Sequence, residues 1–144
     1  MRIRTMGVRT VGAAVIFFAV VHLFINLYIM IAHFTMEPDK FRGLVAALSK
    51  VLGLIAVPEE MGIGMSSVKI LASLLFLTAG AGIMALKEWS RKPLISLLVL
   101  RLFYGIFICV YYKTIHPHLG LIFLEFILLT YYLTRPVVKA ILIK

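Results

Sequence analysis

Long apolar runs separated by short polar turns dominate the sequence, and this pattern predicts four membrane-spanning helices. The runs cover residues 11–34, 67–87, 94–112 and 118–134. Crossing the hydrocarbon core of a bilayer takes about 20 predominantly apolar residues, since each helical residue advances the chain by about 1.5 Å. The four runs reach or approach this length. We therefore expect an all-α membrane protein, built as a bundle of four transmembrane helices.

The connection between the first two runs has a different pattern. Within residues 39–57, apolar side chains such as Phe41 and Leu44 recur every three or four positions, and charged residues such as Arg42 and Lys50 fall on the opposite face. This is the period of an amphipathic helix, which is too polar on one side to cross a bilayer. We expect it to lie in the membrane interface between the first two spanning helices.

Composition narrows the class of protein. The chain has 144 residues, the size of one domain, and 62 % of them are hydrophobic, more than in an ordinary soluble domain. Residues 1–144 are therefore expected to form a single membrane domain. The formal net charge is +9, but most basic residues flank the apolar runs, as topology signals do, which argues against nucleic acid as a partner. Cys109 is the only cysteine, so an intrachain disulfide is excluded.

The basic residues are divided unequally between the two ends of the predicted bundle. The N-terminal segment, the turn between the second and third runs and the C-terminal tail together carry nine Lys or Arg residues, and the opposite side carries five. Short loops rich in Lys and Arg stay in the cytoplasm. This predicts a multi-pass membrane protein with both termini cytoplasmic; its assignment to the bacterial inner (plasma) membrane is an expectation that comes from a resemblance described below.

Two charges of opposite sign fall inside the apolar runs and form the main candidate site. Arg101 and Glu125 lie about 10 Å and about 13 Å from the same end of two antiparallel helices. We expect them to meet, because an unpaired charge in hydrocarbon costs at least about 2.5–3.5 kcal/mol. Tyr104 shares the Arg101 face. The pair is either a proton or substrate-anion site or a structural ion pair that fixes helix register, and the matched signs favour the structural interpretation.

His22 and Asn26, in the first run, complete the predicted intramembrane polar site. Both lie on one helix face. His22 could relay protons or ligate a haem, whereas a hydrogen bond across helices, for example to Ser73, is the commoner role. A haem held by two histidines needs a second histidine at matching depth, and the others lie near the outer surface. We therefore expect no cofactor.

The outer histidines are a separate candidate, for a metal site. His33 ends the first run, His116 and His118 flank the last turn, and acidic residues lie on the same side. Imidazole and carboxylate groups together bind zinc or copper. No fixed ligand spacing supports a site here, so a solvated polar rim is the favoured interpretation.

A run of small residues in the second span predicts close helix packing. Gly80 and Gly82 belong to the sequence Ala-Gly-Ala-Gly, which lets a neighbouring backbone approach. That neighbour is either a helix of the same bundle or a second copy of the chain. The sequence contains no phosphate-binding loop, dinucleotide fingerprint or metalloprotease motif. We therefore expect no enzymatic activity.

Two segments resemble a group of uncharacterised small bacterial four-helix inner-membrane proteins. Residues 80–91 read Gly-Ala-Gly-Ile-Met-Ala-Leu-Lys-Glu-Trp-Ser-Arg, and residues 131–139 read Tyr-Tyr-Leu-Thr-Arg-Pro-Val-Val-Lys. In that group a glycine-rich helix end precedes Leu-Lys-x-Trp-(Ala/Ser)-Arg, and the chain closes with Leu-Thr-Arg-Pro-x-Val-Lys. The resemblance implies a helical bundle in the inner membrane and brings no particular activity.

These features favour a non-enzymatic integral membrane protein that self-associates or serves as an accessory subunit of a larger membrane complex. The first alternative is a small proton-coupled or anion transporter that uses the Arg101–Glu125 pair; four helices are few for a transport path, so this version requires a dimer. The second alternative is a quinone- or haem-binding electron-transfer subunit.

Overall fold

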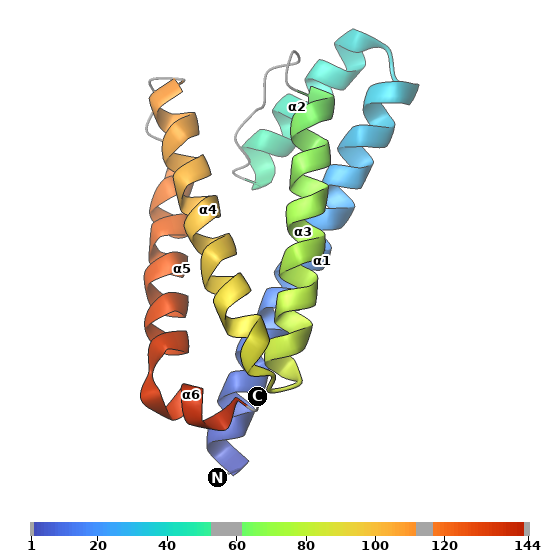
Figure 1. Ribbon diagram of the computed structural model, residues 1–144. Helices are drawn as coiled ribbons and strands as arrows, with labels where there is room; N and C mark the ends of the chain where they lie inside the picture. The colour runs from blue at the N-terminus through green and yellow to red at the C-terminus, as the bar shows by residue number, and fades with distance from the viewer. Residues whose placement is uncertain (1, 53–61, 112–116, 143–144) are drawn as a thin grey trace.

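The chain is almost entirely helical (Figure 1). The computed structural model describes residues 2–52, 62–111 and 117–142, and this part of the chain is 94 % helix with no strands. The elements are, in chain order, α1 (Arg2–Thr35), α2 (Pro38–Leu52), α3 (Gly62–Met84), the 3-10 helix η2 (Glu88–Ser90), α4 (Arg91–Tyr111), α5 (Pro117–Thr134) and α6 (Pro136–Ile141).

Within the described part, three helical segments are long and apolar enough to cross a membrane: Thr5–Thr35, Ser66–Met84 and Glu88–Tyr111. The segment Leu119–Thr134 of α5 is apolar but shorter. The prediction of several apolar helices suited to a membrane is therefore confirmed, with three or four candidates for a full crossing. α1 begins nine residues before the predicted first run, because the basic segment ahead of that run is also helical.

Both ends of the described chain lie at one end of the molecule, together with the turn between α3 and α4 and with α6 (Figure 1). We call this the basal end, and we call the opposite end, where α1 leads into α2, the distal end.

α1 and α3 form a closely packed antiparallel pair because glycines meet at their contact. A Cβ atom added to Gly12 would lie 2.6 Å from the Met84 amide nitrogen and 2.9 Å from the Gly80 carbonyl oxygen. A Cβ atom on Gly80 would lie 3.0 Å from side-chain carbons of Val15 and Ile16. Such short separations leave no room for a side chain, so these two glycines set the distance between the helices.

The α1–α3 pair and the α4–α5 pair share a core only at the basal end. There, α3 buries Ala79 and Ile83, which are 1 % and 0 % exposed, whereas Leu75 and Val68 on the same stripe nearer the distal end are 46 % and 60 % exposed. Figure 1 shows the reason: the two pairs diverge towards the distal end. The core cluster consists of Val8, Val15, Ala79, Ile83, Leu94, Leu98, Leu133, Val138 and Leu142. A closed four-helix bundle therefore stays a prediction.

A tight turn after α3 connects the two pairs. Leu86 adopts a positive φ of 58°, and the Lys87 amide donates to the Gly82 carbonyl over 2.8 Å. This is the usual geometry of a helix C-terminus, at a position where glycine is the common residue. Gly82 also lies against Ser90, and an added Cβ would be 3.1 Å from a ring carbon of Trp89.

At the other side of the basal end, Pro136 separates α5 from α6. Proline cannot continue a helix but suits the first position of a new one. α6 turns back under the bundle (Figure 1), and its Val138 and the following Leu142 are 4 % and 5 % exposed. α6 therefore closes the basal core from below.

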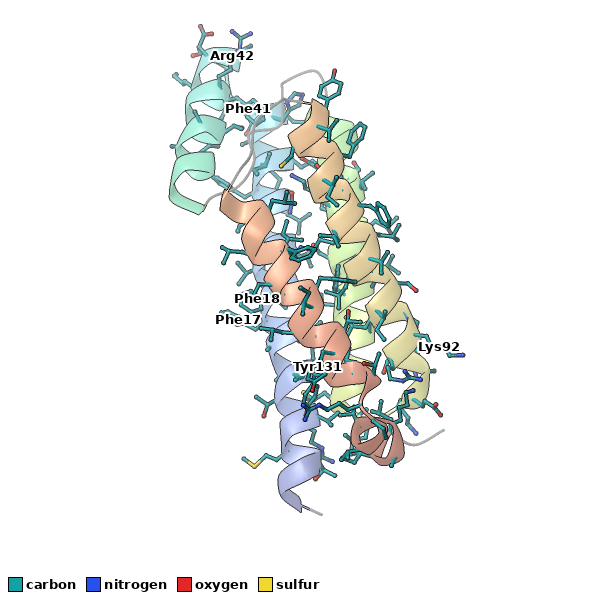
Figure 2. The ribbon with its side chains drawn as sticks, turned by 90° about the vertical axis from the view of Figure 1, so that its left-hand side faces the viewer. Phe17, Phe18, Phe41, Arg42, Lys92 and Tyr131 are labelled. Carbon is teal, nitrogen blue, oxygen red and sulfur yellow. The ribbon has the colours of Figure 1, made fainter. Side chains whose placement is uncertain are left out.

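α2 is the amphipathic helix predicted over residues 39–57, and the structure describes it as far as Leu52. Residues 53–57 lie outside the described part. Phe41 is 5 % exposed, with its ring centroid 5.0 Å from that of His33. In both views α2 runs back from the distal end at an angle to α1 and α3 (Figures 1 and 2). Its position in a membrane interface stays a prediction.

Candidate functional site

Arg101 of α4 and Glu125 of α5 are in direct contact. The Arg101 Nη1 atom donates a hydrogen bond to Glu125 Oε1 over 3.0 Å, and it lies 2.9 Å from Oε2. One guanidinium nitrogen therefore contacts both carboxylate oxygens. The structure thus brings together the two charges that the sequence placed at similar depth.

A missing side chain on α4 lets α5 come close enough for this contact. Gly105 is one turn beyond Arg101 on the same helix face, and an added Cβ there would lie 3.1 Å from Leu119 and 3.4 Å from Ile122. Those two side chains occupy the space that a larger residue would fill. Gly105 was not singled out in the sequence, because a lone glycine does not reveal which helix approaches it.

The pair is only partly enclosed by the chain. The Arg101 side chain is 24 % exposed and the Glu125 side chain 33 % exposed. On α4, Arg101 shares its face with Leu94 and Leu98, which are 0 % and 2 % exposed. The pair therefore lies on the distal side of the basal core, where the two helix pairs begin to separate.

Tyr132, on the α5 face that carries Glu125, lies against α1. Glu125 lies seven residues before Tyr132, so the two share a face of α5. An added Cβ on Gly7 of α1 would lie 3.0 Å from the Tyr132 hydroxyl oxygen, which places this α5 face opposite α1 at the basal end. Further along the same α1 face, Phe18 and Val21 are 56 % and 36 % exposed. The basal contact between α1 and α5 therefore does not extend as far as Phe18 and Val21.

Asn26 and Ser73 are buried between α1 and α3, at 8 % and 5 % exposure. The Asn26 Nδ2 atom donates to the His22 carbonyl over 2.7 Å, and the Ser73 hydroxyl donates to the Lys69 carbonyl over 2.8 Å. Each of these two bonds stays within its own helix, and the hydrogen bond across helices that the sequence suggested for this site stays a prediction.

The predicted intramembrane polar site divides into two groups. The Gly7–Tyr132 contact gives α1 and α5 a common level from which depth can be counted at about 1.5 Å per residue. From that level, Glu125 on α5 lies roughly 10 Å towards the distal end, and His22 on α1 lies roughly 22 Å towards it. Arg101 and Glu125 therefore lie well basal of His22 and Asn26. Tyr104, half-buried on α4, belongs with the Arg101 group.

His33 is packed among aromatic rings. Its ring meets Phe34 and Phe41 edge to face, with centroid distances of 5.6 Å and 5.0 Å. Its Nδ1 atom is buried and has no hydrogen-bond partner among the described residues. His116 lies outside the described part, and nothing is described of the His118 side chain.

No group of three or more His, Cys, Asp or Glu side chains suited to a metal occurs in residues 2–52, 62–111 and 117–142. The histidine-based metal site therefore stays a prediction that depends on the turn before α5.

The two glycines predicted to pack helices have different neighbours in the structure. Gly80 faces α1, whereas Gly82 faces Ser90 and Trp89 of the basal turn. The sequence analysis missed Gly12, although the run Gly12-Ala13-Ala14 carries the same small-residue signal that singled out Gly80.

A shallow, open depression of about 410 Å³ lies where α5 meets α6, lined by Tyr131, Thr134, Arg135, Pro136 and Val137. The Arg135 guanidinium carbon lies over the Tyr131 ring, 4.6 Å from its centroid, and the Arg135 Nη2 atom donates to the Tyr131 hydroxyl over 2.7 Å. The guanidinium is therefore held in one place beside the depression. From the sequence, Tyr131 and Thr134 fell at the end of the last apolar run and Arg135 in the basic C-terminal tail, and nothing there indicated a depression.

Comparison with known proteins finds no matching family model, no matching curated protein and no matching solved structure. The resemblance of residues 80–91 and 131–139 to small bacterial membrane proteins thus stays a prediction. What the chain does has to be argued from its own geometry.

Proposed function

We propose that the chain is a non-enzymatic integral membrane protein that acts by association, either with itself or as an accessory subunit of a larger membrane complex. The observation that carries this proposal is the Arg101–Glu125 contact. The Arg101 Nη1 atom lies 2.9–3.0 Å from the Glu125 carboxylate oxygens, so each charge neutralises the other. A closed ion pair of this kind fixes how two helices sit together and offers no free charge for chemistry.

The partial exposure of the Arg101 and Glu125 side chains favours a neighbouring protein helix over lipid. Lipid tails cannot form hydrogen bonds, so the 24 % and 33 % of these side chains left open would face a medium that solvates charge poorly. A helix from another protein or from a second copy provides better cover. The exposed apolar side chains of α1, α4 and α5 are compatible with either lipid or protein, so they decide nothing by themselves.

The orientation we propose places the basal end in the cytoplasm of a bacterial cell. The basal segments and the tail hold nine Lys or Arg residues against five on the distal side, and basic loops are retained on the cytoplasmic side. Both chain ends lie at the basal end (Figure 1), which agrees with α5 completing an even number of crossings.

One observation favours transport as a second candidate. The Arg101 and Glu125 side chains are 24 % and 33 % exposed, and they lie near the region where the α1–α3 pair and the α4–α5 pair diverge (Figure 1). If water or a small anion enters there, Glu125 would be the proton-carrying group and Arg101 the anion-binding group. Four helices are few for a full path, so this version needs a dimer.

Thiol labelling in membranes separates the two candidates. In a Cys109→Ser background, Leu121→Cys reports on the α5 face that carries Glu125, and Phe123→Cys is the matched control on another face; these side chains are 63 % and 51 % exposed. Association predicts that neither position reacts with a membrane-impermeant thiol reagent. Reaction at Leu121→Cys alone would establish a water-filled path and overturn the association proposal.

The mass of the particle provides the complementary test. We expect native mass spectrometry of the protein, extracted together with its surrounding membrane, to show a homo-oligomer or a defined complex with another chain. A particle that contains a single copy and no other protein would contradict association.

A further inference from the structure

Among the described residues, the exposed cations at the two ends of the molecule differ in whether an acidic side chain lies beside them. At the distal end, Lys40 lies 3.0 Å from Glu37, and Arg42 lies 3.9 Å from Asp39. At the basal end, Glu88 lies 3.9 Å from Arg91 and is the only acid that the described residues place there. Among the side chains whose exposure the structure describes, the exposed basal cations are Arg9, Lys87, Lys92, Arg135 and Lys139.

Arg135 stands out among these cations because its position is fixed by a neutral group. Its hydrogen bond to the Tyr131 hydroxyl and its stacking on the Tyr131 ring hold the guanidinium beside the depression. The only described partner of this guanidinium is uncharged, and no acid in the described part of the chain compensates its positive charge. Lys139 on α6 is exposed nearby and adds to the positive potential.

The α5 surface that leads to Arg135 is graded in polarity. Leu124, Ile127 and Leu128 are 53 %, 46 % and 56 % exposed, and the 60 % exposed Tyr131 continues the same face one turn later. Arg135 follows after one more turn. Hydrocarbon, aromatic interface and cation thus succeed one another along one side of α5, in the order in which a lipid leaflet presents tails, interface and phosphate.

We propose that the depression at the α5–α6 corner binds the head group of an anionic membrane lipid, with its phosphate beside Arg135 and its acyl chains along the Leu124–Leu128 face. The proposal rests on the chain being an integral membrane protein. A lipid fits better than free phosphate, because a free anion would leave the apolar side chains next to Tyr131 uncovered. Arg is well suited to this role, since its planar group presents several donors to phosphate oxygens.

The test compares two lysine or arginine substitutions at the same end. Arg135→Gln removes the charge at the depression, and Lys92→Gln removes an exposed charge on α4, at some distance from Tyr131 (Figure 2). Each purified protein is melted in zwitterionic detergent with phosphatidylglycerol, with phosphatidylcholine or with inorganic phosphate. Native mass spectrometry counts the phosphatidylglycerol molecules that stay bound.

We expect phosphatidylglycerol, and neither of the other two additives, to raise the melting temperature of the wild type and of Lys92→Gln equally. Arg135→Gln should lose most of that rise and bind phosphatidylglycerol about fivefold more weakly, since one cation near a membrane surface contributes about that factor. Arg135→Lys keeps the charge and should keep most of the response, which also shows that a substitution at this position allows folding.

Three results would overturn the proposal. Equal losses in Arg135→Gln and Lys92→Gln would mean a diffuse charge effect. Equal stabilisation by phosphatidylcholine would mean that acyl chains alone bind, and equal stabilisation by inorganic phosphate would mean a free-anion site. Failure of the underlying membrane proposal looks different: the chain would then stay in solution without any detergent.

Discussion

Gly12 of α1 faces the backbone of Met84 on α3, at a distance that admits no side chain. A Cβ atom at position 12 would lie 2.6 Å from the Met84 amide nitrogen and 3.0 Å from its Cα. Backbone atoms inside a helix cannot move aside as the end of a flexible side chain can. The spacing of the α1–α3 pair is therefore fixed from the α1 side at this position.

Gly12→Ala should accordingly push α1 and α3 apart. Overpacking of this kind costs about 1–3 kcal/mol, and we expect a lower free energy of unfolding when circular dichroism follows denaturation in mixed micelles. Gly120→Ala is the matched control, because nothing lies within 4 Å of a Cβ added to Gly120. That change should be neutral or stabilising by up to about 1 kcal/mol, through helix propensity. Similar losses in both variants would show that the α1–α3 contact is not tight.

The Arg101–Glu125 pair predicts a strong dependence of stability on having both partners. Glu125→Gln leaves the arginine charge without its counter-ion, and a hydrogen bond to a charged group contributes about 1.5–3 kcal/mol. The double variant Arg101→Leu with Glu125→Leu should recover much of the loss if the pair is structural. A double-mutant cycle in the same unfolding assay measures the coupling. Wild-type stability of Glu125→Gln would refute an energetic role for the contact.

Because Leu86 has a positive φ, we expect glycine to be more stable than alanine at this position, which is the reverse of the usual order. Alanine usually exceeds glycine in stability, but the left-handed region costs a residue with a Cβ roughly 1–2 kcal/mol. Leu86→Gly and Leu86→Ala lose the same contacts of a side chain that packs against the basal core. We therefore expect the glycine variant to be the more stable by about 1 kcal/mol. A more stable alanine variant would mean that this turn relaxes to another conformation.

α2 depends on Phe41 for its attachment to α1. Phe41 is 5 % exposed, and its ring meets the His33 ring edge to face. Phe41→Ala should release α2, so that hydrogen exchange speeds up over Pro38–Leu52 and stays unchanged in α3 and α4. Lys40→Ala removes only an exposed pair with Glu37, which is worth at most about 1 kcal/mol, and should leave exchange nearly unchanged. Equal exchange in the two variants would locate the attachment elsewhere.

The sequence predicts the apolar helices and the meeting of Arg101 with Glu125, because each follows from a local property. Run length indicates a crossing, and the positions of two charges counted from the same end indicate their depth. The separation of the two helix pairs is not local. It depends on which side of α3 contacts α4, and every face of α3 is apolar, so periodicity carries no direction there.

The same limit explains the missed glycines. Gly105 is flanked by large side chains in the sequence, and only the fold shows that Leu119 and Ile122 of α5 fill its place. Gly82 was predicted to pack against a neighbouring helix, whereas in the structure it lies against Ser90 and Trp89 of the turn that follows it. A small residue in the sequence indicates that another segment packs closely against it, but it does not identify that segment.

α1 and α5 differ in length, so the helix pairs to which they belong would fit a bilayer of a given thickness differently. α1 has 34 residues and α5 has 18, which correspond to about 51 Å and about 27 Å, against a hydrocarbon thickness of about 30 Å. In one bilayer, α1 must tilt or project beyond the lipid tails, whereas α5 must stand nearly upright or draw the two leaflets together. If α5 crosses the bilayer, the acyl length of the surrounding lipid therefore acts mainly on the α4–α5 pair, because α5 has no length to spare.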